Sequence, residues 1–246
     1  MLLDAIAGYD ARDPWSRAVE APAYVAALGC SIKGLRIAVP QTHLYPQLPS
    51  GLRSVHDQAF AVFENLGAEV IPIDMPDPED LYRWTTVINR VEASYIHKDW
   101  IRTRRDDYNV STISRIADGF DVPALDYIEA LERRDRANQR FAQEVFEHCE
   151  ALYCPLLLID VPTIAETDIR TEASAPGIVH RVTQATRWVS FVGLPVLTLP
   201  VGLSAAGLPV AAQLIGPRFA EERLVTLGDA YQSITRWHDR KPPNSA

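Results

Sequence analysis

The strongest arrangement for nucleophilic catalysis in this sequence is a serine and a lysine four residues apart, Ser94 and Lys98. Residues at this spacing share one face of a helix, and a serine hydroxyl becomes a nucleophile when a neighbouring lysine is desolvated and its pKa falls. Glu92 and Asp99 lie beside the pair, and nearby carboxylates keep a lysine charged. We therefore interpret the pair as part of a solvated helix face and assign no catalytic residue from spacing.

Other patterns that would support catalysis or ligand binding are weaker. Ser31 and Lys33 are two residues apart before a predicted strand, no G-x-S-x-G motif occurs, and the mixed charges of Arg102–Tyr108 indicate a surface cluster. No glycine-rich phosphate loop is present. The histidines are scattered without the spacing of a metal site: His43, His56, His97, His148, His180 and His238. We expect no metal ion and no cofactor.

Composition and charge exclude several classes of protein. The chain has 246 residues and a formal net charge of −8, and its only lysines are Lys33, Lys98 and Lys241, so we do not expect it to bind nucleic acid. No apolar run reaches about 18 residues, so no membrane span is predicted, and the first residues lack the features of a signal peptide. An odd number of cysteines indicates free thiols in a reducing cytoplasm: Cys30, Cys149 and Cys154.

The order of predicted elements indicates an α/β fold. Strand Gly34–Pro40, a helix ending at Gly67 and strand Ala68–Ile73 form a βαβ unit, whose strands pair in parallel. The middle of the chain, Asp80–His148, is predicted to be mostly helical. Hydrophobic runs predict three more strands and three more helices: strands within Glu150–Leu158, Leu194–Leu199 and Pro209–Ile215, and helices near Pro22–Leu28, near Val179–Phe191 and after Glu221.

Some of these elements carry packing predictions. The strands Leu194–Leu199 and Pro209–Ile215, joined by a turn at Ser204–Gly207, are apolar on both faces, which is typical of central strands in a covered sheet. We therefore expect this hairpin to have neighbours on both sides. Helical periodicity predicts buried stripes in the middle region, in a long helix that begins at Pro123, and in the closing helix: Ile88, Val91 and Tyr95; Leu125, Ile128, Leu131, Phe141 and Val145; Leu224, Leu227 and Tyr231.

Several segments, taken in order, resemble motifs of the amidase signature family of serine amidases. Gly8–Ser16 is similar to its G-x-D-x-x-D-P-x-S loop, Ile32–Pro40 to its I-K-G-L-R-I-G-V-P strand, and Ala59–Val70 to its A-x-x-x-L-x-x-L-G-A-x-V segment. Tyr127, Ala130 and Arg134 match its D-Y-x-x-A-x-x-x-R helix, Thr235–Pro242 resembles its T-x-W-H-x-x-x-P ending, and the late strand–turn–strand block before F-x-E is matched by Gly193, Leu194, Pro195, Pro200, Gly202, Gly207, Leu208, Pro209, Gln213, Gly216, Phe219 and Glu221.

The resemblance implies which part of the family's fold this chain encodes. In that family a serine, a second serine on a cis peptide and an earlier lysine form the catalytic triad within a G-G-S-S-G type block, which precedes the G-x-D-x-x-D loop. No such block occurs in this sequence. The chain is thus expected to be a C-terminal half without catalytic residues: residues 1–246 as one partial amidase domain, with a mixed β-sheet flanked by helices, the incomplete amidase signature fold.

Two departures fall inside the matched region. The family's T-x-P-x-N is Thr186–Ser190 here, with Trp188 in place of proline, and its D-x-L-x-x-P-T strand has Glu150 and Leu156 in place of aspartate and threonine. In the family the first segment lies by the substrate pocket. The resemblance therefore implies a substrate-binding wall that includes Thr183, Thr186 and Ser190.

These observations leave three functions open. The chain is part of a hydrolase that cleaves small-molecule carboxamides, with the catalytic half on a missing segment or a partner chain. Alternatively, it is an inactive remnant or a structural subunit of a split amidase or of a complex like glutamyl-tRNA amidotransferase. A small-molecule binding module is the third. Because the hairpin is built to be covered, we expect the chain alone to be marginally stable, with a partner chain or a homo-oligomer as its cover.

Overall fold

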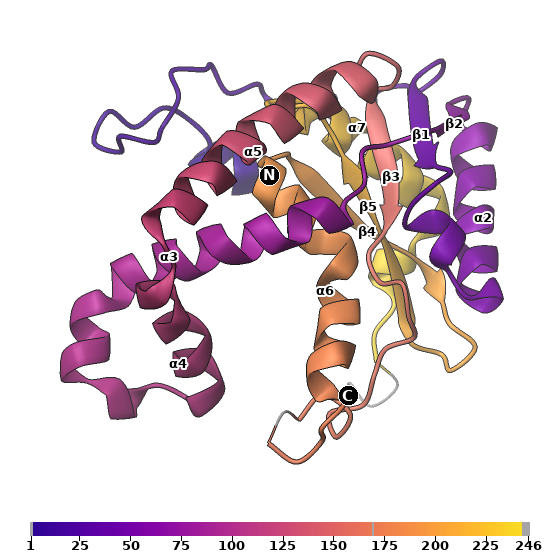
Figure 1. The fold of residues 1–246 in the computed structure, drawn as a ribbon. Coiled ribbons are helices and arrows are strands. Elements are labelled where there is room, and N and C mark those ends of the chain that lie inside the picture. The colour runs from indigo at the N-terminus through magenta and orange to yellow at the C-terminus, as the bar shows by residue number, and fades with distance from the viewer. Residues whose placement is uncertain (1, 169, 243–246) are drawn as a thin grey trace.

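A computed structural model describes residues 2–168 and 170–242, and its centre is a five-stranded mixed sheet (Figure 1). The strand order is β2-β1-β3-β5-β4. β1 runs parallel to β2 and β3, whereas β5 runs antiparallel to β3 and β4. The strands are β1 Arg36–Pro40, β2 Glu69–Ile73, β3 Ala151–Pro155, β4 Val196–Leu203 and β5 Pro209–Ile215. The predicted α/β fold with a mixed sheet is confirmed.

Two parallel strands and the helix between them form the βαβ unit that the sequence predicts. Helix α2, Ser50–Asn65, connects β1 to the parallel strand β2. Gly67 ends the helix with a φ of 89°, a left-handed conformation that glycine adopts without strain. A side chain there would also meet Lys33, whose Cγ lies 3.1 Å from the position of a Cβ. The glycine therefore sets the direction of the chain into β2.

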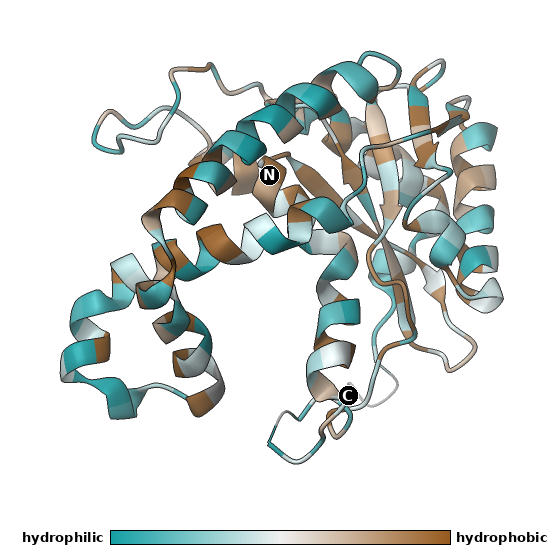
Figure 2. Ribbon diagram, in the orientation of Figure 1, coloured by the Kyte–Doolittle hydropathy of each residue, from teal (hydrophilic) through white to brown (hydrophobic). Residues whose placement is uncertain are grey.

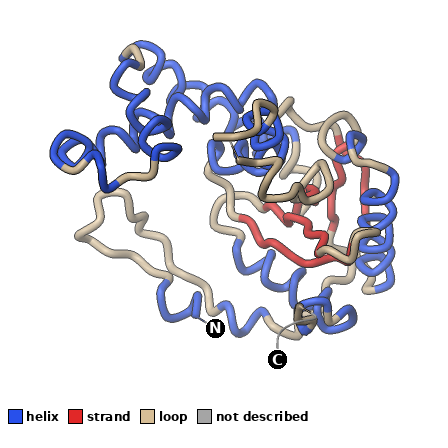
Figure 3. The backbone as a smooth tube through the Cα atoms, turned by 90° about the horizontal axis from the view of Figure 1, so that it is seen from below, coloured by secondary structure: helices blue, strands red, loops and turns tan. Residues whose placement is uncertain are grey.

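Two layers of helices cover the sheet (Figures 1 and 3). α7 packs on one face, where Gly228 lies against Leu197. α6 packs on the opposite face, where the Gln213 side chain donates a hydrogen bond to the Ala185 carbonyl at 3.1 Å. α3 and α5 pack against α6. The helices of the described chain are α1 Leu2–Ile6, α3 Glu79–Thr103, α4 Val110–Ala117, α5 Ala124–Glu144, α6 Ala175–Val192 and α7 Glu221–Thr235, in addition to α2; 3-10 turns are η1 Tyr24–Ala27, η2 Tyr45–Gln47, η3 Arg105–Asp107, η4 Asp118–Asp121 and η5 Trp237–Asp239.

Aromatic side chains fill the space between the layers. Trp188 of α6 is fully buried and stacks on Phe141 of α5, with ring centroids 4.9 Å apart. Tyr153 and Phe63 are fully buried as well, and Tyr231 of α7 is almost so. Trp188 stands at the position where the family pattern has proline, and its ring lies in the core. The tryptophan at this position therefore contributes to core packing.

Within the described chain, only one of the two strands of the hairpin has a strand on both sides. β5 lies between β3 and β4, as expected. β4, in contrast, is the edge strand, and within the described chain no strand pairs with its other side. Val196 is 39% exposed. The run Leu194–Leu199 is apolar on both faces, as a central strand would be. The described chain nevertheless provides only one neighbouring strand for it, β5.

Residues of the predicted helical stripes are buried in the parts of the helices near the sheet, and several are exposed farther from it. Phe141 and Val145 are fully buried, and the inward residues of α7 are buried too. Leu125 and Ile128 are 78% and 53% exposed, and Tyr95 of α3 is 69% exposed. Figure 2 shows apolar residues on the parts of α3 and α5 that run away from the sheet toward α4. These turns contact one another and α4, but Leu125, Ile128 and Tyr95 remain exposed in the described chain.

The helix predicted near Pro22–Leu28 is only the single 3-10 turn η1. Its residues Tyr24 and Ala27 are buried against Val225 of α7. The preceding loop, which joins α1 to η1, extends far from the sheet and returns (Figure 3). One turn is enough to bury this small cluster, so a longer helix is not needed.

Candidate functional site

A cleft of about 1280 Å³ lies between the N-terminal loop, the α3–α5 pair and the start of β4. We call it the motif cleft, because three of the motif segments identified in the sequence contribute to it. Its lining residues are Trp15, Arg17, Val91, Glu92, Tyr95, Ile96, Tyr127, Leu131, Arg134, Asp135, Gly193, Leu194, Pro195, Arg218, Phe219 and Glu221. Segments that are about two hundred residues apart in the chain thus meet at one surface.

The chemistry of the motif cleft is that of binding. Its aromatic side chains offer flat apolar surface, and its arginines and carboxylates are of mixed sign. None of the residues described as lining it is serine, threonine, cysteine, lysine or histidine. A Ser-Ser-Lys mechanism requires serine and lysine side chains. The cleft can hold and orient a molecule or a protein segment, but its described lining residues do not provide the serine or the lysine of such a mechanism.

A few polar contacts fix the walls of the motif cleft. The Tyr127 hydroxyl donates to Glu92 at 3.2 Å, which joins α5 to α3. Burial and the neighbouring Glu92 carboxylate raise the pKa of Tyr127, so the phenol stays protonated and acts as a donor. Arg218 donates to the Val192 carbonyl at the end of α6, at 3.3 Å.

Phe219, beside Arg218, has a left-handed backbone with a φ of 65°, and its side chain is 55% exposed at the rim of the motif cleft. Such a conformation is strained for a residue with a bulky side chain. The surrounding structure therefore holds the aromatic ring at the mouth of the cleft at a cost in conformational free energy.

Thr183, Thr186 and Ser190, the residues predicted to bind substrate, lie on one face of α6, outside the motif cleft. The core side of this helix carries Trp188, and the side toward α3 carries Arg187, which donates to the Tyr82 hydroxyl at 2.7 Å. The helical spacing of the three residues turns them away from Trp188, whereas Arg187 is four residues after Thr183 and three before Ser190 and therefore borders the same face.

The hydroxyls on this face of α6 are partly engaged. Thr183 donates to the Val179 carbonyl at 3.1 Å and Thr186 donates to the Thr183 carbonyl at 3.2 Å. Their oxygens can still accept hydrogen bonds. The face is a short polar strip that begins half-buried and ends at the exposed Ser190.

The serine–lysine pair of the sequence analysis is not a catalytic pair. Ser94 is buried and donates its hydroxyl to the Ile116 carbonyl of α4, so the interpretation as a solvated face is wrong for this residue. The bond fastens α3 to α4. Lys98 points elsewhere, with its Nζ 4.4 Å from the centre of the Tyr95 ring. In the predicted surface cluster Arg102–Tyr108, residues 102–107 are exposed, as expected, and include an Arg104–Asp107 ion pair at 2.6 Å. Tyr108 is half-buried, and its hydroxyl lies 2.8 Å from His97 Nδ1.

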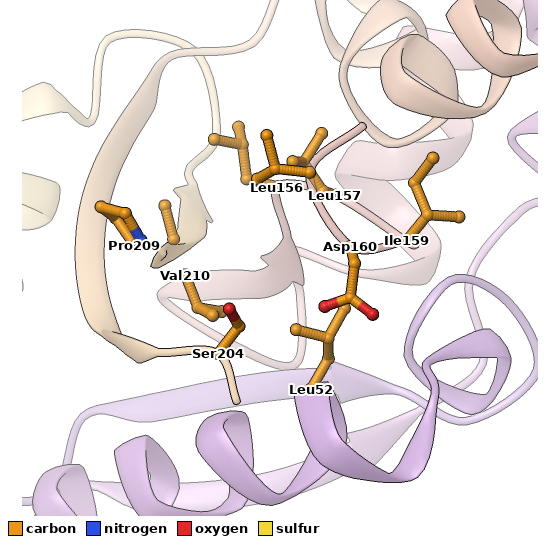
Figure 4. A pocket seen from close by; sticks show the side chains of 10 residues that line it. Leu52, Leu156, Leu157, Ile159, Asp160, Ser204, Pro209 and Val210 are labelled. Atoms are coloured by element: carbon orange, nitrogen blue, oxygen red, sulfur yellow. The ribbon is translucent and has the colours of Figure 1, made fainter. Parts of the chain in front are cut away.

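A second, much smaller cavity of about 50 Å³ lies beside the ends of β3 and β5 (Figure 4). It includes Leu156, which replaces the threonine of the family pattern. Leu52 and Leu157 make most of its surface apolar, and Asp160 and Ser204 are its polar side chains (Figure 4). The Ser204 hydroxyl accepts the Leu208 amide at 3.3 Å and so belongs to the β4–β5 turn. A water molecule fits this space, but a substrate does not.

The comparison with known proteins identifies the class of this chain. A family model described as Amidase matches residues 1–225, so the chain belongs to the amidase family. An amidase of Pseudomonas putida is 31% identical over 248 residues, which cover 98% of this chain and 52% of that protein. A glutamyl-tRNA(Gln) amidotransferase subunit of Chloroflexus aurantiacus is 30% identical over 260 residues, covering 98% and 53%. The chain therefore spans about half the length of these curated relatives.

Solved structures agree with the fold. A structure described as a vestigial protein complex that reveals the origins of an s-triazine catabolic enzyme has a TM-score of 0.78 and 26% identity, over 94% of this chain and 50% of the other. A 6-aminohexanoate cyclic dimer hydrolase with bound substrate has a TM-score of 0.81 at 18% identity, over 98% and 54%. The second supports the fold alone. In both comparisons this chain matches about half of the other, longer chain.

Neither a metal cluster nor a membrane-spanning helix occurs in the described part of the chain. No three histidine, cysteine, aspartate or glutamate side chains within residues 2–168 and 170–242 lie together as a metal-binding group would require. In the same residues, no helix has both the length and the apolar character needed to cross a membrane.

Sequence reasoning did not identify the motif cleft as a site. It found the family motifs separately, and Tyr127, Arg134, Phe219 and Glu221 were all recognised as matches. The motif matches identified the residues, but positions along the chain do not show that the segments meet in space. Trp15 lies within the first motif, and only the structure shows that it lines the motif cleft.

Proposed function

We propose that this chain is the C-terminal half of an enzyme that hydrolyses the C–N bond of carboxamides. The observation that carries the proposal is the motif cleft: three family motifs meet there, and its described lining residues include neither serine nor lysine. A half of such an enzyme that lacks the Ser-Ser-Lys residues would have a binding surface of this kind. The serine nucleophile, the second serine and the lysine then come from a polypeptide segment with a G-G-S-S-G type block.

In this division of roles, the chain supplies scaffold and substrate contacts. The serine of the other half attacks the amide carbonyl, the amine leaves with a proton, and water releases the acid from the acyl-enzyme. The polar strip of α6, from Thr183 to Ser190, would accept or donate hydrogen bonds to the part of the substrate away from the reacting carbon. In this mechanism these residues make binding contacts and take no part in the bond-breaking steps.

The first experiment measures ammonia release from simple carboxamides. We expect no turnover by the purified chain alone, and turnover when it is combined with a polypeptide that contains the G-G-S-S-G block. The control is the same combination with the serines of that block replaced by alanine. Turnover by the chain alone would contradict the proposed absence of catalytic residues.

A second experiment examines the α6 strip in the combined enzyme. Thr183→Val and Ser190→Ala should raise KM several-fold with less effect on kcat, because they remove contacts made equally in the ground state and the transition state. Thr235→Val on α7 is the matched control, since its half-buried hydroxyl also bonds to its own helix, at 3.0 Å from the Tyr231 carbonyl. Equal changes in all three variants would argue against a substrate wall on α6.

A structural role within a larger complex is the second candidate, favoured by the 30% identity to a protein named as a subunit of a glutamyl-tRNA(Gln) amidotransferase. In that case the chain acts only within a complex and gives no turnover with any partner that lacks the remaining subunits. The DNA that precedes the first codon distinguishes the two candidates. An in-frame or adjacent G-G-S-S-G block favours the hydrolase, and its absence favours a structural role or an inactive remnant.

A further inference from the structure

Arg187 borders the polar strip of α6 and has no carboxylate partner in the described chain. It is half-buried, four residues after Thr183 and three before Ser190. No ion pair formed within residues 2–168 and 170–242 includes it. Charged groups that lose contact with water are usually paired with an opposite charge. The positive charge of Arg187 is therefore free to attract an anion.

Tyr82 of α3 holds the Arg187 side chain in place. Arg187 donates from Nη1 to the Tyr82 hydroxyl at 2.7 Å, and its Cζ lies 4.7 Å from the centre of the Tyr82 ring. The His180 ring packs against the same tyrosine, with ring centroids 4.3 Å apart. These contacts fix the position of the guanidinium group and of the phenol. They add no negative charge, so the positive charge is held in one place and is not neutralised.

The Arg187–Tyr82 pair still has hydrogen-bond donors available for a ligand. A guanidinium group has five N–H donors, and the bond to Tyr82 uses one of them. The others are open, because Arg53 Nε and Trp188 Nε1 are the only side-chain nitrogen or oxygen atoms buried without a partner among the described residues. The Tyr82 hydroxyl accepts from Arg187, so its own hydrogen remains free to donate. The pair therefore presents several donors beside one positive charge.

The first turn of α3 also brings a carboxylate, Glu79, to α6, but Glu79 lies toward the other end of this contact. It accepts a hydrogen bond from the Gln184 side chain at 3.3 Å, and His180 Nε2 lies 3.7 Å from it. These two residues are about one and two turns before Arg187, whereas Ser190 is almost one turn after it. An anion that binds on the Ser190 side of Arg187 is thus separated from the Glu79 carboxylate.

We propose that Arg187 and the Tyr82 hydroxyl bind the carboxylate of the substrate, and that the substrate is a carboxamide with a carboxylate group away from the bond that is cleaved. This proposal rests on the proposed function, in which the α6 strip contacts the substrate. A planar guanidinium group matches a carboxylate through two parallel N–H bonds, which an ammonium group cannot form. The exposed Ser190 hydroxyl is placed to add a hydrogen bond. The substrate class is then the monoamides of dicarboxylic acids.

The first test measures ammonia release by the combined enzyme from succinamate, glutaramate and adipamate, and from the methyl ester of each. The esters keep the length of the substrate and lose its charge. We expect kcat/KM for at least one acid to exceed that of its ester about tenfold or more, mainly through a lower KM. Equal kcat/KM values for every acid and its ester would overturn the proposal.

Variants assign this preference to the pair. Arg187→Gln should abolish the preference for the acid, and Arg187→Lys should restore only part of it. Tyr82→Phe keeps the ring and removes the hydroxyl, so it should lower kcat/KM for the acid several-fold and leave the ester unchanged. Arg181→Gln, at an exposed position of the same helix, is the matched control and should change neither substrate. Equal losses for acid and ester in the Arg187 and Tyr82 variants would show that the pair is only structural, and the proposal would be wrong.

Binding of glutarate to the chain alone gives a readout that does not depend on turnover or on the proline-rich termini of the substrate series. Glutarate carries the carboxylate and has no amide to cleave. NMR should show a saturable shift of the Arg187 Nε–H resonance, which is assigned by its loss in Arg187→Lys, and pentanamide should cause no shift. Absence of the shift with glutarate would overturn the proposal, as would an equal shift with sulfate, which would mean unspecific attraction of anions.

The two readouts separate this proposal from the proposed function. A glutarate-dependent shift without turnover of any carboxamide supports the anion site and counts against the hydrolase function. Turnover of carboxamides without a preference for the acids refutes the anion site, and the hydrolase function stands. If Arg187→Gln fails to fold, Arg187→Lys and Tyr82→Phe provide the same comparison, because each keeps most of the contacts between α3 and α6.

Discussion

Acid should destabilise this protein through one buried histidine, His56 on α2. The ring is 1% exposed, and its Nδ1 lies 2.7 Å from the hydroxyl of Tyr153, which is itself fully buried. Burial lowers the pKa of His56 from 6.5 to about 4, and Asp57 offsets this only partly. The ring is thus neutral in the folded protein at neutral pH, so Nδ1 can accept the Tyr153 hydroxyl.

The sign and size of the effect follow from the two pKa values. Between pH 6.5 and about 4 the unfolded chain binds a proton at this ring and the folded chain does not. The contribution to stability is therefore complete above pH 6.5 and is lost as the pH falls to about 4. At about 1.4 kcal/mol for each pH unit, the loss amounts to about 3 kcal/mol, a large part of the stability of an ordinary domain.

The assay is urea unfolding followed by tryptophan fluorescence across this pH range, for the wild type and His56→Gln. The glutamine keeps an acceptor for Tyr153 but does not titrate. We expect the wild type to lose about 3 kcal/mol more than the variant between neutral pH and pH 4. His238→Gln, at a partly exposed position in η5, is the control. Parallel curves for wild type and His56→Gln would refute the reasoning.

Two predictions concern packing. Trp188→Ala removes a fully buried ring that stacks on Phe141 and should lower the free energy of unfolding by about 3 kcal/mol, measured by urea denaturation; a change below about 1 kcal/mol would mean that this layer is loosely packed. Gly119→Ala places a Cβ far inside the contact distance of the Arg90 carbonyl oxygen and should cost about 2 kcal/mol or more. Gly177→Ala in α6, where nothing lies within 4 Å, should instead stabilise by about 0.5–1 kcal/mol; equal losses in both glycine variants would contradict the contact.

Much of the fold could be predicted from the sequence, because local patterns carry it. The βαβ unit follows from a strand, an amphipathic helix and Gly67. The boundaries of β5 were predicted without error as Pro209–Ile215. The inward stripe of α7 is buried as its periodicity requires. In each case the signal lies within a few residues of the feature that it predicts.

The errors have a common physical cause. Leu125 and Tyr95 have helical periodicity suited to burial, but periodicity says which face is apolar and does not say whether anything covers it. The same holds for β4, whose apolar residues suggested two neighbours where the described chain supplies one. Ser94 was misread in the opposite direction, because its polar type and charged neighbours gave no sign of the Ile116 carbonyl that it bonds. Burial depends on partners distant in sequence.

The sequence by itself determined the family, through motifs whose residue types and order are specific, and it also determined that no G-G-S-S-G block lies within these residues. Only the tertiary structure decided that Trp15, Tyr127 and Phe219 meet at one cleft, that Trp188 belongs to the core, and that β4 has an open edge. The reason is that residue types record what each segment must do, whereas the distances between segments arise from how the sheet and its helices pack.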